Sequence, residues 1–256
     1  MNPVFSIILP CYNEKENLPV LINRLLPLQK QYNMEYILVE NGSKDGSLEY
    51  FKRNIENLPG ITAAYVSENR GYGYGLQQGM KAASGDYIGW LHADLQIPPE
   101  SLIPFFDFIL ENHKSSESQE RQKESEARFT RKQFFFLKGR RHGRSLKDNF
   151  FTAGQAVFTS LLFRRRLNDI GAIPVLFSRD MIADIKTDSM PNDFSIELYV
   201  YLAALRKNAI IKRFDVIPGN RKLGKSSWDG NIKAKIKQSF RIFKDTIKIF
   251  KGEKVS

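Results

Sequence analysis

Short apolar segments alternate with amphipathic segments along the first hundred residues, and this alternation restricts the fold more than any other feature. The apolar segments are rich in β-branched and aromatic residues, as buried parallel strands are, and lie at residues 4–9, 35–40, 61–66 and 86–91. Between them, apolar residues recur at helical spacing in 16–32 and 45–58, and more weakly in 73–84. The order strand, helix, strand predicts an open, doubly wound α/β sheet.

Polar or turn-forming residues follow each of the four predicted strands, at 10–14, 40–43, 67–71 and 92–94. Ligands of open α/β sheets bind outside the carboxyl ends of the strands, so we expect these loops to form one site. The alternative for any one loop is that surface loops are commonly polar. The first loop has no glycine, and the glycine-rich "GYGYG" follows the third strand, so neither a dinucleotide fingerprint nor a P-loop is present. A bound nucleotide must then be held by side chains and a metal.

Residues 92–96, "HADLQ", stand where the fourth predicted strand leaves the core. In an extended segment alternate residues point the same way, so His92, Asp94 and Gln96 can present one nitrogen and two oxygen ligands to a single divalent cation. With one carboxylate, such a site is weak and typical of an ion that also binds substrate phosphates. The alternative is a polar strand exit in which Asp94 caps the next helix.

Charge is distributed unevenly along the chain of 256 residues. Residues 1–100 contain 8 Lys and Arg against 11 Asp and Glu, whereas residues 101–256 contain 31 against 17, so the second part carries a net charge of +14. This excess predicts an anionic partner: nucleic acid, an acidic membrane or phosphates. Aromatic residues are not interleaved with the basic ones as in single-strand binders, which disfavours nucleic acid.

Redox and targeting features are few. Cys11 is the one cysteine, so no internal disulfide can form and a reducing compartment is expected. Residues 1–17 lack a basic start and Pro10 interrupts their apolar run, which argues against a signal peptide. No apolar stretch approaches the ~20 residues of a spanning helix. A chain that is soluble, or that lies on a surface, is therefore expected.

Four stretches resemble one protein family: "SIILPCYNEKENLP", "ILVENGSKDGS", "NRGYGYGLQQGMKAASGDYIGWLHADLQIPPE" and "RKLGKSSW". Together they resemble glycosyltransferase family 2, which has the GT-A fold, a Rossmann-like, mostly parallel sheet flanked by helices. The branch they resemble most contains the polyprenyl-phosphate (dolichyl-phosphate) mannosyl- and glucosyltransferases and related enzymes of polysaccharide biosynthesis. The resemblance is dense over 4–100 and sparser, but in the same order, over 134–228.

The resemblance implies an inverting transfer of a sugar from a nucleotide-sugar donor, with Mg²⁺ or Mn²⁺ as cofactor. Asp94 would be a catalytic residue and a metal ligand, with His92 and Gln96 completing the metal motif. His92 stands where this branch usually carries an aspartate, and Glu40 and Asn41 replace the paired aspartates of "VDDGS". The residues implied to bind the donor are Pro10, Tyr12, Glu14, Glu40, Asn41, Asn69, Gly71 and Asp94.

Two basic stretches of the second part are implied to contact phosphates. "FFFLKGRRHGRSLKDNFFTAG" (134–154) predicts a strand, a basic turn and a helix, and guanidinium groups bind phosphate oxygens in pairs; a solvated loop is the alternative. "NRKLGKSSW" (220–228) resembles a loop that closes over donor and acceptor phosphates. The implied acceptor-binding and phosphate-binding residues are Lys138, Arg140, Arg141, Arg144, Arg221, Lys225 and Ser226. Arg140 and Arg221 would also be catalytic, because fixed cations stabilise a departing diphosphate.

The acceptor is expected to be a polyprenyl phosphate. A hydroxyl acceptor needs a general base, whereas a phosphate acceptor is already anionic at neutral pH. Asp169, Asp193 and Glu197 are possible bases, but Asp193 is also typical of a helix N-cap and none lies in the Glu-Asp pair of hydroxyl-using relatives. Two alternatives stay open: transfer to a hydroxyl of a growing cell-surface glycan, and a non-catalytic protein that binds anions on the same scaffold.

The predicted organisation is one GT-A domain, residues 1–228, followed by a basic amphipathic helix in 229–256. Within the domain, 1–111 would bind the nucleotide-sugar and 134–228 the acceptor, and the polar stretch 112–133 would be a mobile insertion, either a linker or a lid. The C-terminal helix can lie on an anionic membrane or pack on its own domain. We expect a cytoplasmic protein, peripheral on the membrane; the sequence predicts no oligomeric state.

Overall fold

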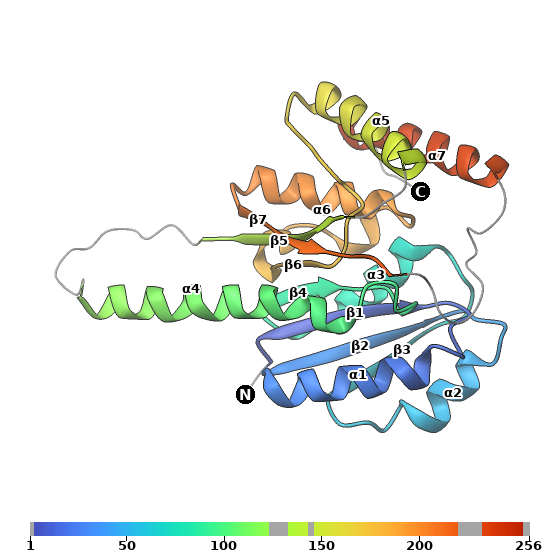
Figure 1. The fold of residues 1–256 in the computed structure, drawn as a ribbon, viewed down its shortest axis with the longest axis vertical. Helices are drawn as coiled ribbons and strands as arrows, with labels where there is room; N and C mark the ends of the chain where they lie inside the picture. The colour runs from blue at the N-terminus through green and yellow to red at the C-terminus, as the bar shows by residue number, and fades with distance from the viewer. Residues whose placement is uncertain (1–2, 123–132, 143–145, 220–231, 253–256) are drawn as a thin grey trace.

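The computed structural model describes residues 3–122, 133–142, 146–219 and 232–252. The strands form one sheet in the order β3-β2-β1-β4-β6-β5-β7 (Figure 1). The strands are β1 (Phe5–Cys11), β2 (Met34–Asn41), β3 (Ile61–Val66), β4 (Tyr87–Trp90), β5 (Phe135–Arg141), β6 (Val175–Ser178) and β7 (Ile210–Val216). The α-helices are α1 (Leu18–Gln31), α2 (Ser47–Asn54), α3 (Tyr72–Ala82), α4 (Ile103–Gln122), α5 (Leu146–Phe163), α6 (Ser195–Arg206) and α7 (Ile232–Lys251).

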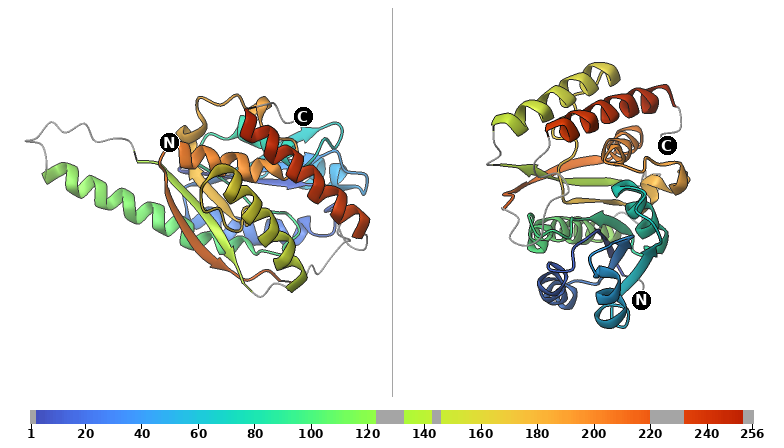
Figure 2. Two further views of the ribbon diagram at one scale, coloured as in Figure 1. Left: turned by 90° about the horizontal axis from the view of Figure 1, so that it is seen from above. Right: turned by 90° about the vertical axis from the view of Figure 1, so that its right-hand side faces the viewer.

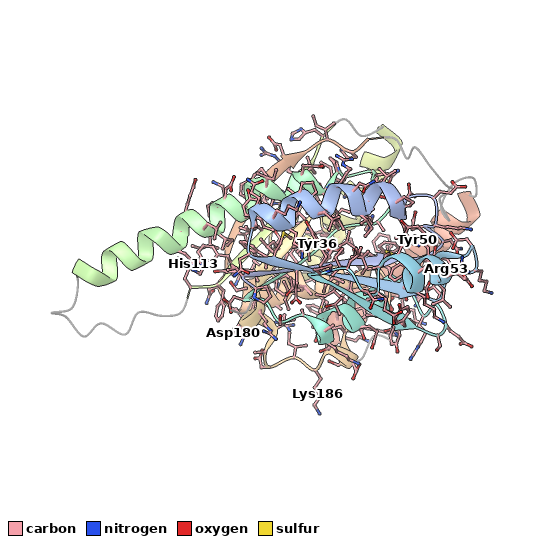
Figure 3. All side chains as sticks on the ribbon, turned by 90° about the horizontal axis from the view of Figure 1, so that it is seen from below. Tyr36, Tyr50, Arg53, His113, Asp180 and Lys186 are labelled. Carbon is pink, nitrogen blue, oxygen red and sulfur yellow. The ribbon has the colours of Figure 1, made fainter. Side chains whose placement is uncertain are left out.

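The strands β1 to β4 are parallel and correspond to the four apolar segments predicted from the sequence. Strand β1 lies between β2 and β4, and its side chains are buried except at Pro10. Tyr36 of β2 is fully buried in the middle of the molecule (Figure 3). Because β1, β2 and β4 are covered on both faces, their sequences are mostly apolar rather than alternating, whereas the edge strand β3 leaves its middle residues exposed or partly buried. The predicted α/β fold class is confirmed.

The second part of the sheet is mixed. Strand β6 runs antiparallel to both of its neighbours, β4 and β5, while β5 and β7 are parallel. Two reversals restore the original direction, so β5 runs the same way as β1 and β4. Its basic carboxyl end, residues 138–141, therefore lies at the same edge of the sheet as the loops after β1, β2 and β4.

Helices cover the sheet in layers (Figure 2). Helix α6 packs on β5, and α7 lies over α6 with α5 against its side. Helix α3 approaches β1 closely, since a Cβ atom on Gly79 would lie 2.3 Å from Ile8 Cγ2. Helix α4 extends beyond the sheet and continues to Gln122, so residues 112–122 of the predicted mobile insertion are helical (Figure 1). Residues 123–132 lie outside the described part of the chain.

Candidate active site

The loops after β1 and β2 lie side by side because Cys11 pairs with Glu40 in the parallel register. The Asn13 amide donates to Ser43 Oγ at 3.0 Å, and the Lys44 amide donates to Asn13 Oδ1 at 2.8 Å. The Glu14 amide donates to Ser47 Oγ at 3.1 Å. These bonds join the first two of the predicted donor-binding loops into one rigid unit.

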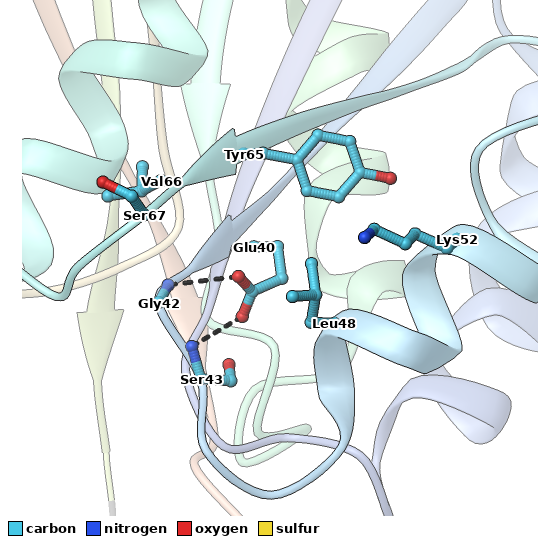
Figure 4. Close-up of a pocket in the computed structure, with 8 residues that line it drawn as sticks. All are labelled: Glu40, Gly42, Ser43, Leu48, Lys52, Tyr65, Val66 and Ser67. Atoms are coloured by element: carbon cyan, nitrogen blue, oxygen red, sulfur yellow. Dashed lines mark hydrogen bonds between the residues drawn. The ribbon is translucent and has the colours of Figure 1, made fainter.

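A pocket of about 370 Å³ opens beside Glu40 (Figure 4). The Glu40 carboxylate is 2% exposed and accepts the amide hydrogens of Gly42, at 3.2 Å, and Ser43, at 2.7 Å. Gly42 has φ +72°, and a Cβ atom there would lie 2.5 Å from the Asn69 amide nitrogen, so only glycine fits this turn. The remaining lining residues are Leu48, Lys52, Tyr65, Val66 and Ser67. The size and the mixed polarity suit part of a nucleotide.

Three predicted donor-binding residues form a network at the start of α3. Asn41 Nδ2 donates to the Gly71 carbonyl at 3.2 Å, and the Gly71 amide donates to Asn69 Oδ1 at 2.9 Å. A Cβ atom on Gly71 would lie 2.3 Å from the Asn192 carbonyl oxygen, so the loop before α6 presses directly on this turn. The Asn41 Oδ1 atom is buried without a hydrogen-bond partner among the described residues.

Pro10, Tyr12 and Glu14 lie in the loop after β1. Pro10 and Tyr12 are partly exposed, as residues that contact a ligand must be. Glu14 is 9% exposed, and its Oε2 accepts a hydrogen bond from Asn17 Nδ2 at 2.5 Å. Glu14 thus holds the start of α1 in this structure, and a contact with the donor stays a prediction.

The "HADLQ" segment is a turn, and the prediction of an extended segment is wrong. The Gln96 amide donates to Asp94 Oδ1 at 3.1 Å, and Leu95 between them has φ +59°. Side chains at alternate positions therefore do not all point one way. His92, Asp94 and Gln96 are each partly exposed at the end of β4. Among the described residues, no three His, Cys, Asp or Glu side chains cluster as a metal site.

Glu197 lies behind this turn and connects it to α6. Its Oε1 accepts hydrogen bonds from Trp90 Nε1 at 2.8 Å and from the Tyr72 hydroxyl at 3.2 Å. The Tyr72 ring in turn contacts the His92 ring edge-on, with 5.2 Å between centroids. Burial raises the pKa of Glu197 to about 7. The sequence suggested Glu197 only as a possible base, and nothing in its local pattern indicated this partnership with Trp90.

Lys138 does not face the acceptor side, contrary to the prediction. Its side chain is fully buried, with Nζ donating to the Ile170 carbonyl at 2.6 Å and lying 5.1 Å from the centre of the Tyr201 ring. Burial lowers the pKa of Lys138 to about 8. Residues 135–139 of β5 are buried whichever face their side chains take, because this part of the sheet is covered on both sides, so Lys138 lies in the core. We therefore leave Lys138 out of the phosphate site.

Arg140 and Arg141 end β5 and differ in exposure. Arg141 is 17% exposed and pairs with Asp169, whose pKa it holds below the usual range against the effect of burial. Arg140 is 54% exposed and pairs with Asp215, which also accepts from His142 Nε2 at 2.9 Å. Arg141 is thus a structural anchor, while Arg140 presents a guanidinium group at the surface of this edge.

The other predicted phosphate-binding residues lie outside the described part of the chain: Arg144, Arg221, Lys225 and Ser226. The Gly219 amide donates to the Gln96 carbonyl at 2.7 Å. The chain beyond β7 therefore passes the "HADLQ" turn at residue 219, the last residue of the range 146–219.

The sequence model of the glycosyl transferase family 2 matches residues 6–171, which include the loops after β1, β2 and β4 and the basic end of β5. The chain belongs to this family. The match covers the donor half of the predicted domain and the first part of the acceptor half.

Two curated relatives of this chain have the same name. An undecaprenyl-phosphate 4-deoxy-4-formamido-L-arabinose transferase from Photorhabdus laumondii is 40% identical over 100 residues, 38% of this chain and 31% of that protein. The Yersinia enterocolitica protein of the same name is 42% identical over 101 residues, again 38% and 31%. The aligned part thus spans 31% of the length of these curated relatives.

Solved structures show the same fold. Glucosyl-3-phosphoglycerate synthase from Mycobacterium tuberculosis, crystallised with Mn²⁺, UDP-glucose and phosphoglyceric acid, superimposes with a TM-score of 0.66 at 14% identity. The superposition covers 98% of this chain and 80% of that one. This glycosyltransferase family 2 chain therefore has the GT-A fold predicted from its sequence.

Proposed function

We propose that this family 2 glycosyltransferase transfers a sugar from a nucleotide-sugar to a polyprenyl phosphate, with inversion at the sugar and with the help of a divalent cation. One observation carries the proposal: the Glu40 pocket, the Asp94 turn and the exposed Arg140 lie at the carboxyl edge of one sheet. Such a transfer requires a pocket for the nucleoside, a site for its diphosphate and a positively charged side chain for the acceptor phosphate.

The donor would lie across the ends of β1, β2 and β4. The nucleoside would enter the pocket beside Glu40, and the rigid turn at Gly42 would keep that pocket open. The diphosphate would then extend towards Asp94 and the start of α3. Asn41 and Gly71 would shape this passage, because their hydrogen bond fixes the turn before α3.

His92 and Asp94 would hold the cation, whereas Gln96 follows the turn at Leu95 and is left out of the proposed ligands. A carboxylate and an imidazole are acceptable donors for Mn²⁺ or Mg²⁺ when substrate phosphates complete the coordination shell. Bound there, the cation would stabilise the negative charge of the departing nucleoside diphosphate. Tyr72 would position the His92 ring, because it contacts that ring and is itself tied to Glu197.

Phosphate as the acceptor group is supported by the surroundings of the three possible bases. Asp169 is paired with Arg141, and Asp193 lies 3.0 Å from Arg241 Nε. Glu197 is 3% exposed and holds Trp90. A phosphate needs no base, since it is already anionic at neutral pH. The names of the curated relatives, which are undecaprenyl-phosphate transferases, agree with this choice.

Calorimetric titration with a set of nucleoside diphosphates, with and without Mn²⁺, tests the donor part of the proposal. We expect one nucleotide to bind tightly in the presence of Mn²⁺ and the Asp94→Ala variant to lose the metal-dependent part. Asp184→Ala is the matched control, because Asp184 is exposed and follows β6, whose direction places it at the opposite edge. Binding that ignores both Mn²⁺ and Asp94 would leave only a basic anion-binding scaffold.

Transfer of label from the nucleotide-sugar identified in this way to undecaprenyl phosphate tests the acceptor part. A matched acceptor with a free hydroxyl in place of the phosphate is the comparison. Transfer to the hydroxyl compound alone would support polysaccharide elongation instead.

A further inference from the structure

Apolar side chains are exposed on the helix pair formed by α5 and α7. Most large apolar residues in the described part of the chain are buried, but five on these two helices are not. They are Val157 at 60% exposed, Leu161 at 75%, Phe240 at 71%, Ile247 at 40% and Phe250 at 51%. Exposed apolar residues gathered on neighbouring elements indicate a surface that binds something.

Helices α5 and α7 pack against each other and against the rest of the domain. The Phe158 ring contacts Phe243 edge-on at 4.9 Å, and the Phe163 ring contacts Phe250 at 5.4 Å. Ile249 is buried, and α7 also packs on α6. One face of α7 therefore packs against α5 and α6, while its outer face still carries exposed apolar residues.

The outward side of α7 combines apolar and basic residues. Phe240, Lys244, Ile247 and Lys251 follow one another at intervals of four, three and four, which places them along one side of the helix, and all four are exposed. Arg164, Arg165 and Arg166, directly after α5, are exposed as well. Basic residues around exposed apolar ones are typical of helices that lie in the interface of an anionic bilayer.

The one acidic residue of α7 is kept away from this surface. Asp245 is 3% exposed and lies within ion-pair distance of Arg241 and Lys248, at 3.9 and 4.0 Å. Helix α7 contains seven Lys and Arg residues against this single aspartate. With the aspartate buried, the outer face is complementary in charge to an anionic surface, and a second copy of the same face would repel it.

We propose that the α5–α7 surface docks this protein onto a bilayer of anionic phospholipids. The inference rests on the proposed function, since a polyprenyl phosphate lies in a membrane. The geometry joins the surface to the site in two ways. Helix α5 follows β5, which carries Arg140, and Arg241 of α7 pairs with Asp193. The neighbouring Asn192 carbonyl accepts the Tyr74 amide hydrogen of α3 at 3.1 Å.

Vesicle co-sedimentation of the full chain tests the docking surface. Phosphatidylglycerol vesicles should bind the protein, phosphatidylcholine vesicles should not, and binding should weaken as salt rises. Leu161→Glu and Phe240→Glu should each weaken binding to phosphatidylglycerol about tenfold or more, since burying such a side chain contributes about 1.5–3 kcal/mol. Both side chains are more than two-thirds exposed, so neither change disturbs the core.

Val20→Glu is the matched control, because Val20 is 42% exposed on α1, on the opposite side of the sheet (Figure 2). It should bind vesicles like the unchanged protein. Absence of vesicle binding, or binding that both variants retain, would overturn the docking surface. The docking surface would also be overturned if the unchanged protein formed a dimer, if Leu161→Glu dissociated that dimer, and if the protein did not bind vesicles. Nucleotide titration without vesicles reports on the proposed function separately, so failure of either idea can be recognised independently.

Discussion

Replacing Glu197 by glutamine removes a buried acidic group while keeping its shape and the oxygen that accepts from Trp90. Glu197 is 3% exposed, and its Oε2 has no hydrogen-bond partner among the described residues. Burial therefore disfavours the charged form and raises the pKa of Glu197 from 4.5 to about 7. A glutamine at this position cannot titrate.

The size of the effect follows from this shift. A carboxyl group with a higher pKa in the folded than in the unfolded protein takes up a proton on folding. It therefore adds stability below pH 4.5 that is lost as pH rises to about 7. A shift of this size corresponds to about 3 kcal/mol of unfolding free energy. Lys138, whose pKa burial lowers to about 8, loses in Glu197→Gln the nearby charge that raises its pKa. Its pKa then falls further, and a lysine with a lowered pKa adds stability as pH rises, so this change increases the difference between the two proteins in the same direction.

Urea unfolding at pH 5 and at pH 7, followed by tryptophan fluorescence, measures the difference. Between these pH values the unfolding free energy of the unchanged protein should fall by about 2–3 kcal/mol more than that of Glu197→Gln. Asp245, whose pKa is raised to about 6 mainly by burial, contributes equally to both proteins and cancels. Parallel pH dependence of the two proteins would refute the reasoning, because it would mean that Glu197 titrates in the same way folded and unfolded.

Three further predictions concern the site. Gly42→Ala should lower nucleotide affinity about tenfold or more in the titration, because its Cβ atom would lie 2.5 Å from a backbone nitrogen where φ is +72°. Arg141→Ala should lower the unfolding free energy by about 3 kcal/mol in urea denaturation, because it leaves Asp169 charged and largely buried; Asp169→Asn should recover part of the loss. Arg140→Ala should lower kcat/KM for the phosphate acceptor about tenfold while Asp193→Asn changes it little; the reverse order would indicate a hydroxyl acceptor.

Part of the site could be read from local patterns. Each apolar segment of the first hundred residues is long enough for one strand, and burial on both faces keeps the sequences of β1, β2 and β4 mostly apolar. Once four parallel strands are predicted, the loops that hold Glu40, Asn69 and Asp94 must meet at one edge. This is why the sequence predicts which loops lie together, while their role in donor binding stays a prediction.

The outcome at Lys138 and Arg141 could not be read in the same way. Both are basic residues near the end of one strand, yet one enters the core and the other pairs with Asp169. Their partners, the Ile170 carbonyl and the Asp169 carboxylate, lie between α5 and β6, 32 and 28 residues further along the chain. The local sequence around a residue does not show which distant residues it will contact in the folded chain.

The sequence by itself determined the alternating strands and helices, the position of the loops after β1, β2 and β4 and the basic amphipathic character of α7, since all of these follow from short-range periodicity. Only the tertiary structure decided that "HADLQ" turns at Leu95, that Glu197 is tied to Trp90, and that α7 packs inward through Asp245 while Phe240 stays outside. Each of these three features depends on which side chains are buried together when the chain folds. Residues far apart in sequence make these contacts, so a local sequence pattern cannot predict them.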